Sequence, residues 1–218
     1  MNSALGYGKL NVLGSLPEVV SMTVLAPPLP PRLAPGANFA PTAKLWTVDE
    51  FHRLGELGVF EGRQAMLIDG TILEEGPMNP PHAIASTKAE DLIRDLVGRS
   101  FHVRVQKPMV FGLHIDPEPD IAVVRGRPAD YTAHPTTAAL IVEVSDSSLK
   151  YDTAEKADLY SAAGIPEYWV LDLNGRQLMV FRDPTENGYG TKFTVAADGA
   201  VAPLAKPDAP VKIADLLP

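Results

Sequence analysis

Hydrophobic residues follow a two-residue period, or form short unbroken runs, in several segments of the chain. Apolar runs rich in β-branched residues and bounded by turn residues predict strands at residues 101–111, 119–125, 138–145, 167–172, 177–181 and 189–195. Residues 65–73 form two further apolar segments around Asp69-Gly70, a dipeptide typical of a β-hairpin turn. The pattern therefore predicts a protein in which strands form a large part of the core.

Helical periodicity separates these strand segments. Residues 82–98 place their apolar side chains on one stripe and end at a glycine, which predicts a long helix. Shorter helices are predicted at residues 48–54, after the candidate N-cap Thr47, and at residues 152–163, before Gly164. The order of helix, strands, helix and strands predicts an α/β fold with a mixed central β-sheet flanked by helices.

The two ends of the chain differ from its centre. Residues 1–43 are rich in proline and have few periodic apolar positions, which predicts an extended or mobile tail. Residues 44–218 are predicted to form a single domain that finishes in a proline-broken C-terminal tail. Met22 lies inside the first segment, so translation beginning there instead of at Met1 is an alternative.

Composition and charge limit the classes of function. The 218 residues are 45% hydrophobic, enough for one substantial core. With 27 acidic and 19 basic residues the formal charge is −8, so any contact with a nucleic acid is expected to be local or metal-mediated. The absence of cysteine fits a reducing cytoplasm, and no apolar run reaches the length of a membrane span. We therefore expect a cytoplasmic protein without a membrane partner.

Two carboxylates stand inside or beside buried strand segments. Asp120 follows Pro119 at the start of the segment 119–125, and Glu143 lies within the apolar run 139–145. An unpaired charge at such positions costs several kcal/mol, so two acids on neighbouring strands predict a divalent metal. The backbone carbonyl of Val144 is a candidate third ligand. Because these donors are all hard oxygens, Mg²⁺ or its substitute Mn²⁺ is favoured over zinc.

A cation beside the metal would complete a hydrolytic site. Strand alternation puts position 145 on the same face as Glu143, but this position holds Ser145. The nearest suitable donor is Lys156, which shares one helical face with Asp152 and Tyr160. We therefore predict that Lys156 reaches back to the sheet and orients a water.

Several of these segments together resemble a known family. Residues 119–120, 143–148 and 151–169, together with the Asp69 hairpin and His82, are similar to the Uma-two endonucleases of the PD-(D/E)XK restriction-endonuclease-like superfamily. The resemblance spans about residues 45–189.

The resemblance implies a restriction-endonuclease-like core in which Asp120 and Glu143 hold magnesium. Lys156 would take the part of the superfamily lysine, moved from the strand to a helix. Gln106 is implied to touch the metal-bound water or the substrate. The oligomeric state stays open, and a homodimer is one expectation because many nucleases of this fold act as dimers.

The sequence departs from the family pattern at two places. Met66 stands where the family often has an acid just before the hairpin, which leaves Glu61 or Glu74 as candidates for the role of that acid. In the long helix only Glu90 is a candidate for an extra carboxylate. The metal is therefore expected to have few protein ligands.

Each candidate also has a structural interpretation. Asp120 can cap a turn, Glu143 can pair with a buried Arg or Lys, and Lys156 can bridge to Asp152 on the helix surface. His82 is interpreted as a helix-start residue. The aromatic side chains of Tyr160, Tyr168 and Trp169 are expected in the core. The remaining basic residues, either solvated or at the rim of a phosphate groove, are Arg99, Arg104, Lys107, Arg125 and Arg127.

The predicted function is that of a magnesium-dependent endonuclease that hydrolyses DNA phosphodiester bonds with water as the nucleophile. The resemblance implies products with 3′-hydroxyl and 5′-phosphate ends. One alternative is a non-catalytic interaction protein that retains the nuclease fold. The other is a hydrolase of a small phosphate ester, which a closed and narrow pocket would favour.

Overall fold

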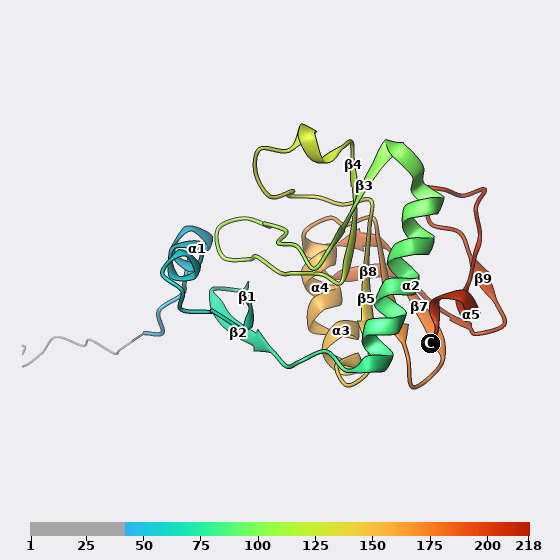
Figure 1. Ribbon diagram of the computed structural model, residues 1–218, viewed down its shortest axis with the longest axis horizontal. Coiled ribbons are helices and arrows are strands. Elements are labelled where there is room, and N and C mark those ends of the chain that lie inside the picture. The colour runs from blue at the N-terminus through green and yellow to red at the C-terminus, as the bar shows by residue number, and fades with distance from the viewer. Residues whose placement is uncertain (1–41) are drawn as a thin grey trace, which may run out of the picture. The chain divides into compact units, whose positions relative to one another are not determined.

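The computed structural model describes residues 42–218 (Figure 1). The tail predicted over residues 1–43 lies almost entirely outside this range. The helices are α1 (Val48–Glu56), α2 (Pro80–Val97), α3 (Leu149–Thr153), α4 (Glu155–Ala162) and α5 (Ile213–Leu216). The strands are β1 (Gln64–Ile68), β2 (Thr71–Glu75), β3 (Phe101–Val105), β4 (Ile121–Arg125), β5 (Leu140–Ser145), β6 (Glu167–Asp172), β7 (Gln177–Thr185), β8 (Gly188–Ala196), β9 (Ala200–Val201) and β10 (Val211–Lys212).

A six-stranded sheet in the order β3-β4-β5-β6-β7-β8 forms the centre of the fold. Strands β5 and β6 pair in parallel, and every other neighbouring pair in this sheet is antiparallel. The crossover between the parallel strands carries α3 and α4, as a parallel connection requires. The predicted α/β fold with a mixed central sheet is therefore confirmed.

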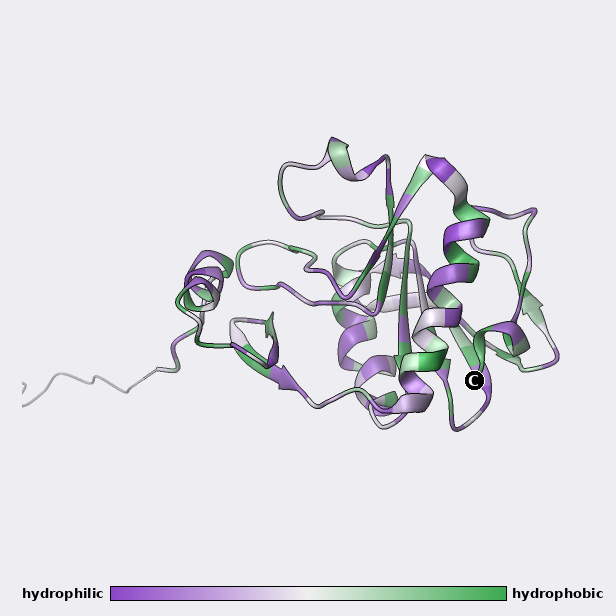
Figure 2. Ribbon diagram, in the orientation of Figure 1, coloured by the Kyte–Doolittle hydropathy of each residue, from purple (hydrophilic) through white to green (hydrophobic). Residues whose placement is uncertain are grey.

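Helices cover both faces of this sheet (Figure 1). The apolar stripe of α2 packs on one face, where Ala89 and Ile93 contact alternate residues of the central strands. Helix α4 covers the other face with Ala157 and Tyr160. Figure 2 shows α2 with hydrophobic residues on one side and polar residues on the other. Both central strands β5 and β6 are buried along their whole length, which explains their unbroken apolar runs.

Helix α1 and the hairpin β1–β2 form a smaller assembly beside the main sheet (Figure 1). Their contacts include a small core around Phe51 and Leu67. The hairpin joins the loop before β4 through reciprocal backbone hydrogen bonds between Leu67 and Asp116. At the hairpin turn Gly70 has φ of 74°, and a Cβ there would lie 2.8 Å from the Leu45 Cβ, so the turn needs glycine. Thr47 caps α1 as predicted.

The structure differs most from the prediction in three parts of the chain. Strand β3 ends at Val105, not at residue 111, because Gln106 adopts φ of 46° and the chain leaves the ladder. The helix predicted at 152–163 is two helices that begin at Leu149 and break at Ala154, whose ψ of −84° is not helical. The C-terminal segment is not only a tail, because Ile213 and Leu216 are fully buried on the α2 side of the core.

None of the helices within residues 42–218 combines the length and the apolar character that crossing a membrane requires.

Candidate functional site

Asp120 and Glu143 lie side by side on neighbouring strands. The antiparallel register pairs Ile121 with Val142, so the next residues, Asp120 and Glu143, face each other across β4 and β5. Glu143 Oε2 accepts a hydrogen bond from the Asp120 amide at 3.3 Å, and Asp120 Oδ2 accepts one from the Val144 amide at 2.8 Å. The two residues are only 8% and 2% exposed. The structure therefore brings the two predicted carboxylates together.

Lys156 reaches these carboxylates from α4. Its Nζ lies 3.1 Å from Glu143 Oε1, 3.6 Å from Asp152 Oδ1 and 3.6 Å from Glu75 Oε1. Lys156 is buried, so the interpretation as a surface lysine is wrong. Its predicted reach back to the sheet is present. The same contact with Glu143 is also the buried ion pair that the structural alternative predicts.

Two further side chains contact Oδ1, the second carboxylate oxygen of Asp120. His82 Nε2 lies 3.2 Å from Asp120 Oδ1, and Gln106 Nε2 donates to the same atom at 3.5 Å. The His82 amide also donates to the N-cap Asn79, so His82 does begin a helix. The interpretation of His82 as a helix-start residue alone is incomplete, because its ring enters the site. Nothing in the local pattern of α2 could have predicted a contact with a residue 38 positions away.

The three aromatic residues expected in the core are fully buried. Tyr160 has a second contact, because its hydroxyl donates to Glu143 Oε1 at 2.8 Å. Tyr168 donates to the backbone oxygen of Asp152 at 2.9 Å. The core thus sets the position of the site's acids through two tyrosine hydroxyls.

Of the acids proposed to replace a carboxylate at Met66, Glu74 lies only at the rim of the cavity beside the site, and Glu61 is not part of the cavity's lining. Glu74 forms an exposed ion pair with Arg63, and Glu61 is exposed. Glu90 pairs with Arg94 on α2 and does not line the site either. Glu75 is the acid that the hairpin contributes. Strand alternation could have identified it, because Glu75 lies on the same face of β2 as the partly buried Leu73.

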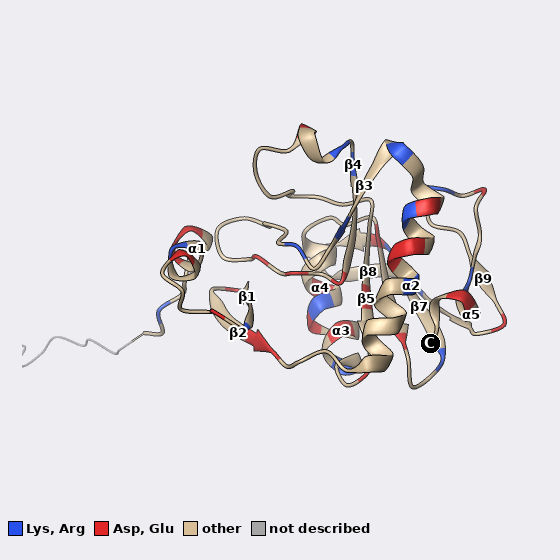
Figure 3. Cartoon of the chain, in the orientation of Figure 1, with Lys and Arg blue, Asp and Glu red and all other residues tan. Residues whose placement is uncertain are grey.

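The site opens into a cavity of about 330 Å³. The walls come from the hairpin, the β2–α2 connection, the start of α2, the end of β5, α3 and α4. Figure 3 shows acidic residues at the end of β2, near these walls. None of the basic residues considered as a phosphate rim lines the cavity; these are Arg99, Arg104, Lys107, Arg125 and Arg127.

Burial and neighbouring charges shift the pKa values of the groups in this cluster in different directions. Burial raises the pKa of Glu143 to about 8, although the charge of Lys156 opposes this rise. Burial also opposes ionisation of Asp120, but His82 and the Val144 amide hold the pKa of Asp120 below its usual value. The hydrogen bond to Asp120 raises the pKa of His82. Burial acts against the charge on Lys156, but the surrounding acids raise the pKa of Lys156 above its usual value.

The donor set suits a hard divalent cation with a water-rich shell. Asp120 and Glu143 offer carboxylate oxygens, and the Val144 carbonyl stays a predicted third ligand. Within residues 42–218 there is no group of three or more His, Cys, Asp or Glu side chains arranged to hold a metal ion. Mg²⁺ is commonly held by one or two carboxylates and keeps several waters, so the two acids fit it. They do not fit a zinc site, which takes three or four protein ligands.

Residues 48–207 match the Uma2 family, described as "Putative restriction endonuclease". No curated protein matches the chain. A crystal structure from Anabaena variabilis ATCC 29413, described as "a putative nuclease belonging to DUF820", is similar with a TM-score of 0.65 and 18% sequence identity. The similarity covers 78% of this chain and 96% of the other, and at this identity it shows the fold. The family match spans most of the described residues, and we conclude that the chain belongs to the Uma2 family and has its nuclease-type α/β fold.

Proposed function

We propose that this protein is a magnesium-dependent endonuclease that hydrolyses phosphodiester bonds in DNA with water as the nucleophile. The observation that carries the proposal is the convergence of Asp120, Glu143 and Lys156 on one cavity. Two acids from adjacent strands and a buried ammonium 3.1 Å from one of them provide both metal ligands and a cation for phosphate chemistry. Membership of the Uma2 family supports the same reaction class.

Asp120 and Glu143, with the carbonyl of Val144, would hold the cation. When bound, Mg²⁺ would withdraw charge from the scissile phosphate and lower the pKa of a water. The protein prepares Asp120 for this role by holding it ionised. The Val144 amide fixes Oδ2, while His82 and Gln106 fix Oδ1 at longer distances.

Lys156 has a separate role in this proposal. Its pKa stays above the usual value for lysine because several acids surround it, so it remains a cation during the reaction. From its position beside Glu143 it would orient the attacking water and offset charge on the phosphate. We expect an in-line displacement that leaves 3′-hydroxyl and 5′-phosphate ends, which end-labelling and ligation can detect.

Cleavage of circular DNA tests the proposal. Supercoiled duplex and circular single-stranded DNA would be incubated with Mg²⁺ and with the native protein, Asp120→Ala or Lys156→Ala. Each substitution should lower the cleavage rate about 100-fold or more, because each removes a charge aimed at the reacting phosphate. Matched controls are Asp158→Ala and Lys150→Ala, which change exposed residues of α4 and α3. Equal cleavage by all five proteins would contradict the proposal.

One observation favours the non-catalytic alternative. All four carboxylate oxygens of Asp120 and Glu143 already accept hydrogen bonds from the protein or contact Lys156. If this arrangement is purely structural, Mn²⁺ should not change the melting temperature. A ligand that binds only the folded state must raise it by mass action. A saturable rise that Asp120→Ala abolishes would exclude the alternative.

The small cavity favours the second alternative, a hydrolase of small phosphate esters. Bis-p-nitrophenyl phosphate tests it, because this diester has no nucleic-acid structure. Hydrolysis of this compound without any cleavage of DNA would replace the proposed substrate while keeping the chemistry.

A further inference from the structure

The proposed reaction centre lies in a small, partly open cavity. The hairpin β1–β2 forms one wall, and Met66 and Leu73 are its apolar lining. The sheet, α3 and α4 form the opposite side, where Asp120 and Glu143 are buried. A contact of 3.6 Å between Glu75 Oε1 on the hairpin and the α4 ammonium spans the space between the two walls. A scissile phosphate must therefore pass between the hairpin and the core to reach the acids.

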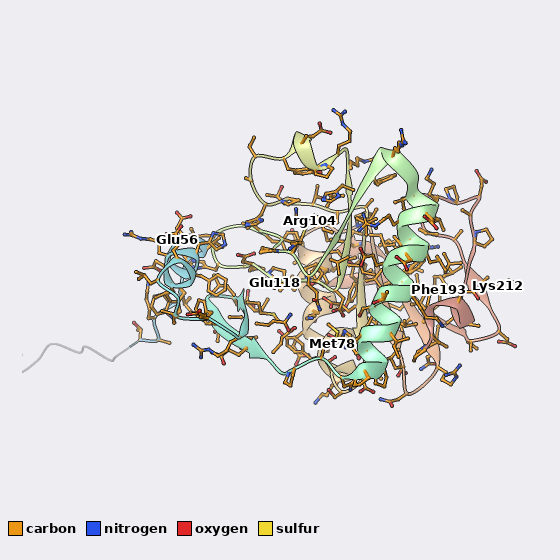
Figure 4. All side chains as sticks on the ribbon, in the orientation of Figure 1. Glu56, Met78, Arg104, Glu118, Phe193 and Lys212 are labelled. Atoms are coloured by element: carbon orange, nitrogen blue, oxygen red, sulfur yellow. The ribbon has the colours of Figure 1, made fainter. Side chains whose placement is uncertain are left out.

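A side-chain hydrogen bond crosses the mouth of the cavity. The exposed residues of its lining are Gln64 at the start of β1, residues 74–79 at the end of β2 and on the β2–α2 connection, and residues 147–148 after β5. Figure 4 labels Met78 on this connection. The Asn79 side-chain amide donates to Asp146 across the mouth. A cavity of about 330 Å³ is at the small end of ligand sites, so we expect it to hold about one nucleotide and no base-paired duplex.

The charge of the residues at the mouth also favours single-stranded over duplex DNA. Glu74, Glu75 and Asp146 line it, and Lys156 is the one Lys or Arg among the lining residues that the structure describes. Arg63 pairs with Glu74 from outside the lining and Lys156 contacts Glu75, so the acids outnumber these two cations by one. Duplex DNA carries one negative charge per about 1.7 Å of its axis, against about 3.4 Å for one strand. An acidic mouth with a single lysine therefore repels a duplex more strongly than a single strand.

We propose that the site takes single-stranded DNA, with one nucleotide inside the cavity, and excludes uninterrupted duplex. This inference rests on the proposed nuclease function and adds its substrate class. The half-buried ring of Tyr151 lies in the same wall as the partly buried Leu73, so these two side chains offer a surface for an unstacked base, to which the buried Met66 adds little. Bases of any sequence stack on aromatic rings, so this wall selects strandedness and not sequence.

One labelled strand in three contexts tests the inference. The strand would be offered alone, fully paired, and paired with a short unpaired gap, each with Mg²⁺ and the full-length protein. We expect kcat/KM to be at least about 10-fold higher for the free strand and for the gap than for the duplex. Duplex cleavage at an equal or higher rate would overturn the inference and leave the nuclease function standing. If none of the three substrates is cleaved, both the inference about single strands and the proposed nuclease function are wrong.

The role of Tyr151 needs a readout that separates binding from folding. Tyr151→Leu should raise KM for the single strand about 10-fold while kcat and the melting temperature change little, and Tyr151→Phe should restore KM. Tyr131→Leu is the matched control, since Tyr131 is also half-buried but lies outside the cavity. An unchanged KM in Tyr151→Leu, or an equal rise in Tyr131→Leu, would contradict base stacking on this wall.

Discussion

Glu143 and Glu167 are buried carboxylates on the adjacent parallel strands β5 and β6, but their surroundings differ. Arg182 donates two hydrogen bonds to Glu167 Oε1, at 2.6 and 2.9 Å, and the Trp169 indole donates to the same atom at 2.9 Å. The Leu204 amide donates to Oε2 at 2.6 Å. A guanidinium and two neutral donors thus satisfy Glu167, which forms a structural ion pair.

Glu143 borders a cavity and has no cation of its own. Its neighbour Lys156 is shared with Asp152 and Glu75, and Asp120 adds another acid. Burial raises the pKa of Glu143 to about 8. The comparison shows that burial of an acid does not by itself make a site. A surplus of negative charge beside an open space can accept a cation, whereas a matched ion pair stabilises the fold.

The largest expected difference between Glu143 and Glu167 is in the effect of their substitution on DNA cleavage. Glu143→Gln should lower DNA cleavage in Mg²⁺ about 100-fold or more, because the amide removes a charged oxygen ligand. The melting temperature without metal should change little, since burial raises the pKa of Glu143 and the folded protein therefore gains little stability from its charge. Cleavage assays and calorimetry on the same preparation check both halves. A large loss of stability with activity retained would reverse the assignment.

Glu167→Gln should show the opposite pattern. It leaves the partly buried Arg182 guanidinium without its carboxylate, so the free energy of unfolding should fall by about 3 kcal/mol in urea titrations. Cleavage by the folded protein at low temperature should stay within about twofold, because Glu167 does not line the cavity. Glu186→Gln, at an exposed position, is the control for the glutamine substitution itself.

Two tyrosine substitutions sharpen the comparison with a smaller effect. Tyr160→Phe removes the hydroxyl that donates to Glu143, and Tyr168→Phe removes the one that donates to the Asp152 backbone. Each should lower the free energy of unfolding by about 1 kcal/mol. Only Tyr160→Phe should also lower the cleavage rate, because only this hydroxyl touches a proposed ligand. Equal rates for the two variants would argue that Glu143 is structural.

A third buried acid, Asp116, gives the smallest expected effect. Burial raises the pKa of Asp116, although His52 donates to Oδ2 or accepts from it at 2.6 Å, and Oδ1 has no hydrogen-bond partner. A raised pKa means that the folded state binds the proton more tightly than the unfolded state. The resulting stability is full below the usual pKa of aspartate and is lost as the pH rises through the higher folded value.

Urea titrations of the native protein and of Asp116→Asn across this acidic range measure that loss. We expect the native protein to lose stability relative to the variant as the pH rises, because burial raises the pKa of Asp116 in the folded state. A difference of the opposite sign would show that the contact with His52 outweighs the effect of burial.

Much of the fold follows from local patterns in the sequence. The alternation of apolar residues predicts the strands of the central sheet, and the Asp69-Gly70 turn predicts the hairpin. The apolar stripe of residues 82–98 predicts α2. Residues close in the chain decide these features, so the sequence alone is sufficient. The break at Ala154 and the packing of Ile213 and Leu216 were missed, because contacts with the rest of the core decide them.

Some features of the candidate site can likewise be recognised from the sequence, and others appear only in the tertiary structure. Two acids on strands that follow one another in the chain can be recognised from the sequence, and strand alternation gives Glu143 its face. The sequence does not show that His82 meets Asp120, that Glu75 is the acid from the hairpin, or that Glu167 is neutralised by Arg182. Each of these contacts joins separate elements, and only their packing sets the distances.

The sequence by itself determined the strand and helix periodicity, the turn residues and the presence of two acids beside buried strands. The tertiary structure decided which buried acid faces a cavity, which cations reach it and how wide the approach is. The physical reason is that backbone preferences act over a few residues. Charge balance and enclosure, by contrast, depend on side chains that are brought together from distant parts of the chain.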